Sequence, residues 1–239
     1  MKVINNFDFL RAVSELLPQL LGEALRIVII VTILGFILAL IVGFILALAR
    51  VSKSKILNGI VIVFQEIIRG TPLLVQLVYI YYVVPLLIEV IVYLITGNDQ
   101  KVEMSPVVAG IIGMGINYGT YISEVIRSAI ISIDKGQIEA GLALGLSRRQ
   151  AMFRIVIPQA IRNSIPVFGN YLVMLVKDTS LMAYITAQEF LMTTKAYTAQ
   201  TFLTIESYTI LALVYLCICI PLSLVMKLVE RKLNKNLKW

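Results

Sequence analysis

Long apolar runs, separated by short polar segments, constrain this chain more than any other feature of its sequence. A helix needs roughly 20 residues to cross a hydrocarbon core of ~30 Å. Several stretches approach or exceed that length: 24–49, 56–95, 106–126, 165–190 and 207–226. Hydrophobic residues make up 59% of the chain and charged residues 15%, whereas soluble domains are nearer half apolar and a quarter charged. The sequence therefore predicts an all-α, polytopic membrane protein with five transmembrane helices.

The run 56–95 is too long for a single crossing, because as one helix it would extend about 60 Å. Proline removes a helix hydrogen bond and clashes with the preceding turn, so Gly70-Thr71-Pro72 and Pro85 are the candidate breaks. We therefore expect a crossing at 60–84, followed by a short helix at the far membrane surface.

The N-terminal segment 1–21 has an amphipathic helical pattern. It lacks the apolar run and small-residue cleavage site of a signal peptide, so we expect it to be retained. Its apolar side chains fall on one helical face: Phe7, Leu10, Val13, Leu17 and Leu20. We predict a helix lying on the membrane surface, followed by a transmembrane domain at 22–230 and a basic tail at 231–239.

Loop charges predict the orientation of the chain. The segments 50–55, 127–164 and 227–238 are rich in Lys and Arg, whereas 97–104 contains Asp99, Lys101 and Glu103. The positive-inside rule then places the N-terminus outside and the C-terminus in the cytoplasm. Because the basic residues collect in these loops, the net charge of +7 indicates membrane orientation and membrane lipid rather than nucleic acid as a partner.

Cysteine and histidine usage excludes several kinds of site. Cys217 and Cys219 lie two residues apart in an apolar helix and thus on different faces, so we expect inert core thiols rather than a disulfide or a metal site. The sequence contains no histidine, which excludes histidine-based catalysis and histidine metal ligation.

Polar and charged residues inside the predicted spans are the candidates for a solute path. A charge at the bilayer centre costs at least about 2.5–3.5 kcal/mol on insertion scales, so such groups should face the protein interior or water. They are Glu66, Arg69, Asn117, Glu124, Lys177 and Asp178.

Two of these groups admit alternative interpretations. Glu66 and Arg69 are three residues apart, so they form either a structural ion pair on one helical face or part of a solute path. Glu124 either contacts solute or pairs with a basic group such as Lys177; in its own span its nearest base is Arg127.

Lys177-Asp178-Thr179-Ser180-Leu181, here called the polar run, falls near the middle of the fourth predicted span. Four consecutive polar residues cannot all face one side of a helix, so we expect the helix to meet a cavity or to open there. Thr179 and Ser180 are candidates to cap a restarted half-helix whose backbone donors would bind a carboxylate.

A long polar segment at about 132–164, here called the docking segment, lies between two membrane spans and suggests a surface for another protein. Glu139-Ala140-Gly141 is followed by Gly145, Ile155, Ile157 and Pro158. This spacing resembles the EAA loop of ATP-binding-cassette (ABC) importer permeases, with Gly141 where the family has a second alanine. We expect two short helices with a bend near Gly145 and with Ser147 capping the second.

Further motifs resemble the polar amino acid permeases of this family, over roughly residues 16–228. The second-span motif is Arg69-Gly70-Thr71-Pro72-Leu73-Leu74-Val75-Gln76, and the third-span motif is Tyr121-Ile122-Ser123-Glu124-Val125-Ile126-Arg127. Lys135-Gly136-Gln137, Pro158-Gln159-Ala160 and the polar run match as well, in the family's order.

The resemblance implies a type I ABC importer permease in a prokaryotic cell membrane, with two sets of functional residues. The predicted ATPase-coupling residues are Glu139, Ala140, Gly141, Gly145, Ser147, Arg148 and Pro158. The predicted substrate-binding residues are Glu66, Arg69, Thr71, Gln76, Asn117, Glu124, Lys177, Asp178, Thr179, Ser180 and Leu181.

The resemblance also implies partners. These are an ABC ATPase dimer, a second permease subunit that is identical or a sister, an extracytoplasmic solute-binding protein and an amino acid substrate. No phosphate-binding loop is present in the sequence, so ATP and Mg would be bound by the partner ATPase and no cofactor by this chain. The expected activity is ATP-driven import of polar amino acids, with basic ones as a specific hypothesis. An ion-coupled secondary transporter or channel and a membrane scaffold are the alternatives.

Overall fold

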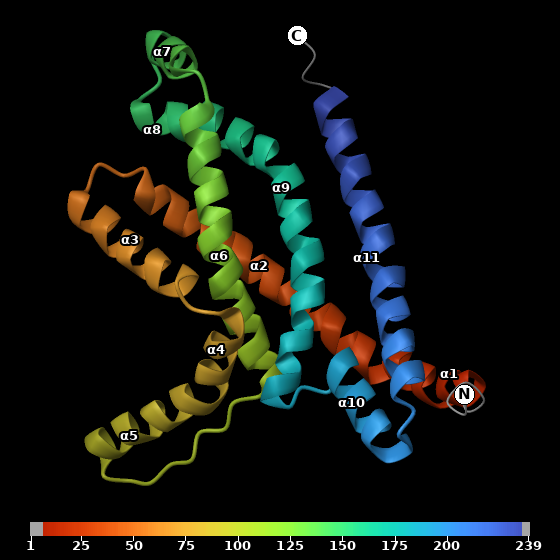
Figure 1. Cartoon of the computed structure of the whole chain (residues 1–239). Helices are drawn as coiled ribbons and strands as arrows, with labels where there is room; N and C mark the ends of the chain where they lie inside the picture. Colours follow the sequence, from red (N-terminus) through yellow and green to blue (C-terminus); the bar gives the residue numbers. More distant parts are fainter. Residues whose placement is uncertain (1–6, 236–239) are drawn as a thin grey trace. The chain divides into compact units, whose positions relative to one another are not determined.

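The computed structural model describes residues 7–235, which form helices and contain no strand; most connections are short, and residues 97–105 form a longer loop (Figure 1). The predicted all-α fold is therefore confirmed. The ends of the predicted interfacial helix (1–6) and of the basic tail (236–239) lie outside the described residues. The chain divides into two compact units. The first comprises the segment ending at Phe36, Thr71–Met114 and Met174–Pro221; the second comprises Ile37–Gly70, Gly115–Val173 and the segment from Leu222.

The N-terminal part begins with α1 (Phe9–Gln19), capped by Asp8, whose side chain accepts a hydrogen bond from the backbone N–H of Arg11. A π-helical turn (Leu20–Ala24) with a non-helical Gly22 separates α1 from α2 (Leu25–Arg50). The predicted N-terminal helix thus exists, and its position at the membrane surface stays a prediction.

The inward face of α1 differs from the predicted apolar face. Its buried residues are Ala12, Leu16 and Leu20, whereas Leu10 is 87% exposed. Most of the predicted face therefore points away from the chain, where it remains available for lipid.

The second apolar run contains α3 (Lys55–Arg69), α4 (Leu73–Val78), a π-helical turn (Tyr79–Val83) and α5 (Val84–Thr96). The predicted break at Gly70-Thr71-Pro72 is confirmed, so the prediction of one helical crossing at 60–84 was wrong. The predicted break at Pro85 was also wrong, because Leu73–Thr96 is one continuous helix. The π-helical turn directly before Pro85 is wider than an α-helical turn, so the helix continues past Pro85 although proline has no backbone N–H to donate.

The remainder contains α6 (Pro106–Ser132), α7 (Lys135–Ala143), α8 (Arg148–Ala151), a π turn (Met152–Val156), α9 (Ile157–Asp178), a 3₁₀ helix η4 (Thr179–Ile185), α10 (Phe190–Thr201) and α11 (Thr204–Lys235). Within the predicted span 165–190, the α-helix ends at Asp178 and the chain continues without a gap as the tighter 3₁₀ helix η4 to Ile185. The polar run is therefore marked by a change of helix type, and an opening of the helix there stays a prediction.

Among the described residues, three helices are long and apolar enough to cross a membrane. They are Phe9–Arg50, Leu73–Thr96 and Thr204–Lys232. The multi-pass character of the sequence therefore has a structural basis, while five spans and the orientation of the termini stay predictions.

Small residues bring α2 and α6 close together in the second unit. Ala39 and Ala47 of α2 are fully buried, and Gly43 lies between them at helical spacing. A Cβ atom added at Gly43 would lie 2.5 Å from Cγ2 of Ile122, and one at Gly119 would lie 2.7 Å from Cγ1 of Val42. Such close approach of backbones is the usual packing device of membrane helices.

Polar contacts fix α1 in the first unit. The Tyr197 hydroxyl of α10 donates to Glu15 Oε2 at 2.9 Å, and the Asp8 backbone N–H donates to Glu206 Oε1 at 2.9 Å. Burial and the neighbouring Glu15 carboxylate raise the pKa of Tyr197, so its hydroxyl stays protonated and remains a donor at neutral pH.

The two cysteines are free, as expected, but the prediction that both are core thiols was wrong. Cys217 is exposed and Cys219 is partly exposed on the surface of the chain.

Candidate functional site

The docking segment folds as a helix, a tight turn and a second helix. Asp134 caps α7 by accepting from the Gly136 backbone N–H at 2.6 Å. Gly145 has φ +84°, a left-handed conformation that glycine adopts without steric cost. Ser147 then caps α8 in a capping box, in which Ser147 and Gln150 exchange side-chain-to-backbone hydrogen bonds.

The predicted bend at Gly145 and cap at Ser147 are confirmed. The second helix is not short, however, because α8 continues through a π turn into α9. Pro158 lies just after that π turn, where the missing N–H is accommodated as it is near Pro85.

Gly141 allows α7 to pack on the helix that follows the turn. It is buried, and a Cβ atom there would lie 2.9 Å from Cδ1 of Ile155 and 3.3 Å from Cβ of Ala151. The Leu146 backbone N–H donates to the Gly141 carbonyl at 3.0 Å and closes the turn. A small residue at this position therefore allows α7 to lie close to Ile155 and Ala151.

The outer surface of the docking segment combines charged and apolar side chains. Glu139, Ala140 and Arg148 are exposed. Leu144 is 83% exposed and Phe153 is 48% exposed, with the Arg149 guanidinium 6.0 Å from the Phe153 ring centroid. Exposed large apolar side chains beside charges are typical of a protein interaction surface.

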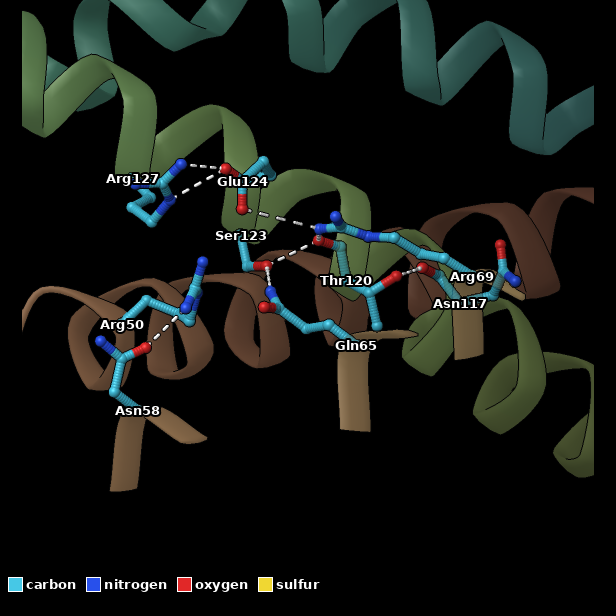
Figure 2. A network of polar contacts seen from close by, with 9 residues as sticks. All are labelled: Arg50, Asn58, Gln65, Arg69, Asn117, Thr120, Ser123, Glu124 and Arg127. Atoms are coloured by element: carbon cyan, nitrogen blue, oxygen red, sulfur yellow. Dashed lines mark hydrogen bonds and ion pairs between the residues drawn. The ribbon is translucent and has the colours of Figure 1, made fainter. Parts of the chain in front are cut away.

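In the second unit, a polar network connects α3 and α6 (Figure 2). Arg69, at the end of α3, donates to the backbone carbonyl of Thr120 and lies 3.9 Å from Glu124 Oε2. Its guanidinium also lies over the Tyr121 ring, 5.4 Å from the centroid. Arg69 is therefore held by groups from α6, at the edge of the Gly70-Thr71-Pro72 break.

The possible ion pair between Glu66 and Arg69 is not formed within 4.0 Å in the described part of the chain, where Arg69 pairs with Glu124 instead. Glu124 also accepts hydrogen bonds from Arg127, including one at 2.8 Å from Nε. The alternative in which Glu124 pairs with a basic group is therefore realised with Arg127 and Arg69 (Figure 2).

Sequence reasoning missed several members of this network. Gln65 is buried and donates to the Ser123 hydroxyl at 2.6 Å, while Ser123 donates to the Thr120 carbonyl at 2.6 Å. Arg50 donates to the side chain of Asn58. An amide one turn before Arg69 in an apolar helix was a usable signal for Gln65, because buried amides need partners.

The predicted substrate residues are divided between the two units. Glu66, Arg69, Asn117 and Glu124 belong to the second unit, whereas Thr71, Gln76 and the polar run belong to the first. In the first unit, the Gln76 amide donates to the Thr71 carbonyl and hydroxyl at 3.0 and 2.8 Å.

The predicted capping role of Thr179 and Ser180 was wrong. The Thr179 hydroxyl donates back to the Val176 carbonyl at 2.7 Å, and the restarted helix α10 is capped by Glu189.

Comparison with known proteins places these features in a family. Residues 35–235 match the family described as binding-protein-dependent transport system inner membrane component, and the chain belongs to it. It is 38% identical to an L-cystine transport system permease protein of Bacillus subtilis (strain 168), over 85% of this chain and 82% of that protein. It is 35% identical to a glutamine transport system permease protein of Escherichia coli (strain K12), over 95% of this chain and 98% of that protein.

A solved structure described as an amino acid ABC transporter with histidines is similar as well. The identity is 29% and the TM-score is 0.80, over 95% of this chain and 99% of that one. The relatives are thus amino acid ABC transporter permeases, which confirms the family predicted from the motifs. Such permeases are membrane transport components rather than enzymes.

Proposed function

We propose that this chain is the permease subunit of an ATP-driven importer that moves polar amino acids into the cytoplasm by alternating access. The observation that carries the proposal is the docking segment, a preformed helix–turn–helix with an exposed acid and exposed apolar side chains on an otherwise membrane-like chain. An ABC ATPase dimer that holds ATP and Mg is the partner this surface fits. A second permease subunit and an extracytoplasmic solute-binding protein complete the assembly.

In the proposed cycle, ATP draws the two ATPase subunits together and moves the paired docking segments with them. The permeases then change from inward-facing to outward-facing, and hydrolysis resets them. Five spans, an outer N-terminus and a cytoplasmic C-terminus are part of this proposal. They place the basic docking segment and the basic end of α11 on the side where ATP is available.

Family membership favours this function over the two alternatives. An ion-coupled transporter or channel would need no ATPase, and a scaffold would move no solute. The experiment is co-purification of the tagged permease with its ATPase and binding protein, followed by reconstitution into liposomes. ATP-dependent uptake of a labelled amino acid supports the proposal; uptake driven by an ion gradient without ATP, or no uptake at all, refutes it.

A zwitterionic solute needs one site for its carboxylate and one for its ammonium group. Arg69 supplies the first in this proposal: its guanidinium makes a long contact with Glu124, and its buried Nε has no hydrogen-bond partner in the described structure. Glu124 supplies the second. The backbone near the polar run is the other candidate for the carboxylate.

A basic amino acid is the sharper hypothesis for the solute. Glu66 is exposed and is not paired with Arg69, so its carboxylate is available for the second positive charge of arginine, lysine or histidinium. The glutamine relative favours a neutral polar solute instead. Uptake of labelled arginine, lysine, histidine, glutamine and glutamate decides between them. We expect Glu66→Gln to reduce arginine uptake more than glutamine uptake; an unchanged arginine preference would exclude this role for Glu66.

A further inference from the structure

The chain between α9 and α10, here called the connecting segment, consists of the 3₁₀ helix η4 followed by residues 186–189, and all of it lies in the first unit. Within and just after η4, Met182, Ala183, Ile185 and Ala187 are each less than a tenth exposed. Thr186 adopts φ 62°, a left-handed conformation that is rare for a β-branched residue. Such a conformation persists only where the surrounding structure fixes it, so this connecting segment has one defined shape.

Glu189 fixes the far end of the connecting segment. Its side chain is fully buried, and both carboxylate oxygens accept backbone hydrogen bonds at 2.8 Å, one from Leu191 and one from Met192. A buried carboxylate is costly unless it is hydrogen-bonded, and a negative charge is favoured at a helix N-terminus. Glu189 therefore determines where α10 begins and how it is oriented relative to η4.

Tyr215 of α11 connects Glu189 to the polar run. Its hydroxyl donates to Glu189 Oε2 at 3.5 Å, a long hydrogen bond, and the side chains of Thr179 and Ser180 are near enough to influence it. Its ring packs edge-on against Phe190, with 5.3 Å between centroids. One phenol thus contacts the residues that begin α10 and lies near the residues that follow α9.

We infer that Glu189 and Tyr215 are positioning residues, which hold Thr179 and Ser180 in the arrangement in which the polar run meets the solute. The inference rests on the proposed function, because the solute role of the polar run is part of it. Without the phenol hydroxyl, the two side-chain hydroxyls lose a shared partner and can rotate toward backbone carbonyls, as Thr179 already does with Val176. The shape of the solute site would then be less uniform, although the surrounding helices stay packed.

Tyr215→Phe tests this inference, because it removes one hydroxyl and keeps the ring that packs on Phe190. Tyr208→Phe is the matched control: Tyr208 lies two turns earlier on α11 and is exposed. The permease–ATPase complex is purified without binding protein, and its dissociation constants for labelled arginine and glutamine are measured together with its Tm. Uptake is measured in parallel with the complex reconstituted together with its binding protein.

We expect Tyr215→Phe to weaken binding of the preferred amino acid about five-fold, which is the effect of losing one neutral hydrogen bond. Its Tm should fall only slightly, because Glu189 keeps both backbone donors, and Tyr208→Phe should change neither quantity. Unchanged affinity in Tyr215→Phe overturns the inference, as does a lowered Tm with unchanged affinity, which would make the tyrosine a structural brace only. A wild-type complex that transports but binds no labelled amino acid also overturns it. A wild-type complex with no ATP-dependent uptake of any labelled amino acid refutes the proposed function itself.

Discussion

Gly43 of α2 lies against Ile122 of α6, whereas Gly59 of α3 faces open space. We therefore predict that Gly43→Ala lowers the stability of the protein and that Gly59→Ala raises it. In Gly43→Ala, the new Cβ would lie 2.5 Å from Ile122 Cγ2 and 3.1 Å from the Gly119 carbonyl oxygen. Carbon atoms in ordinary contact are about 3.5–4.0 Å apart, so the helices must separate by about 1 Å. Ile122 is fully buried and β-branched, so its side chain cannot rotate away.

The change in the free energy of unfolding in Gly43→Ala is the sum of two opposing effects. Overpacking of a well-packed core costs about 1–3 kcal/mol. Alanine in place of glycine inside a helix stabilises the folded state by about 0.5–1 kcal/mol. We therefore expect Gly43→Ala to lower the free energy of unfolding by about 1–2 kcal/mol. In Gly59→Ala on α3, the new Cβ would meet nothing within 4 Å, so the stabilising term acts alone.

Thermal unfolding in detergent micelles, followed by circular dichroism, measures both variants against the wild type. One kcal/mol corresponds to about 2–4 °C in Tm for a chain of this size. We expect the Tm of Gly43→Ala to fall and that of Gly59→Ala to rise. A Gly43→Ala protein as stable as the wild type would refute the view that the small residues hold α2 against α6.

Two further predictions concern the docking segment. Glu139→Ala and Gly145→Leu should leave the protein inserted in the membrane but uncouple ATP hydrolysis from transport. The first variant removes the exposed acid, and the second places a side chain on a residue at φ +84°, which strains the backbone. Wild-type stimulation of the ATPase by loaded binding protein in both variants would contradict this prediction. Cysteines at Asn98 and at the 83% exposed Leu144 test the orientation: an impermeant maleimide should label Asn98→Cys in intact cells and leave Leu144→Cys unlabelled, and the opposite pattern would reverse the proposed topology.

Features that depend on local chemistry could be predicted from the sequence. The bend at Gly145 and the cap at Ser147 follow from residues within a few positions of one another, and both are present. The break at Gly70-Thr71-Pro72 follows from proline in the same way. The end of the α-helix within the polar run agrees with the cost of placing four polar residues on one apolar helix.

Features that depend on tertiary contacts could not be predicted. Arg69 has an acid three positions away in the sequence, yet its ion pair is with Glu124, which only the packing of α6 against α3 brings near. The capping role of Glu189 could not be predicted, because it becomes evident only once a helix is known to start at Phe190. Pro85 appeared to be a helix breaker, and the π turn that accommodates it has no evident sequence signal.

The hydrogen bonds of the turn between α7 and α8 have a consequence for the thermodynamics of association. The turn is closed by bonds within the chain, from Leu146 to Gly141 and between Ser147 and Gln150. Ordering the backbone of one residue costs about 1–2 kcal/mol, so a partner that met a disordered loop of four residues would lose about 4–8 kcal/mol of its affinity. A partner that meets this turn loses little, because the turn is ordered beforehand. Its exposed side chains, Leu144 among them, are therefore free to diverge between relatives and to change partner choice without changing the fold that presents them.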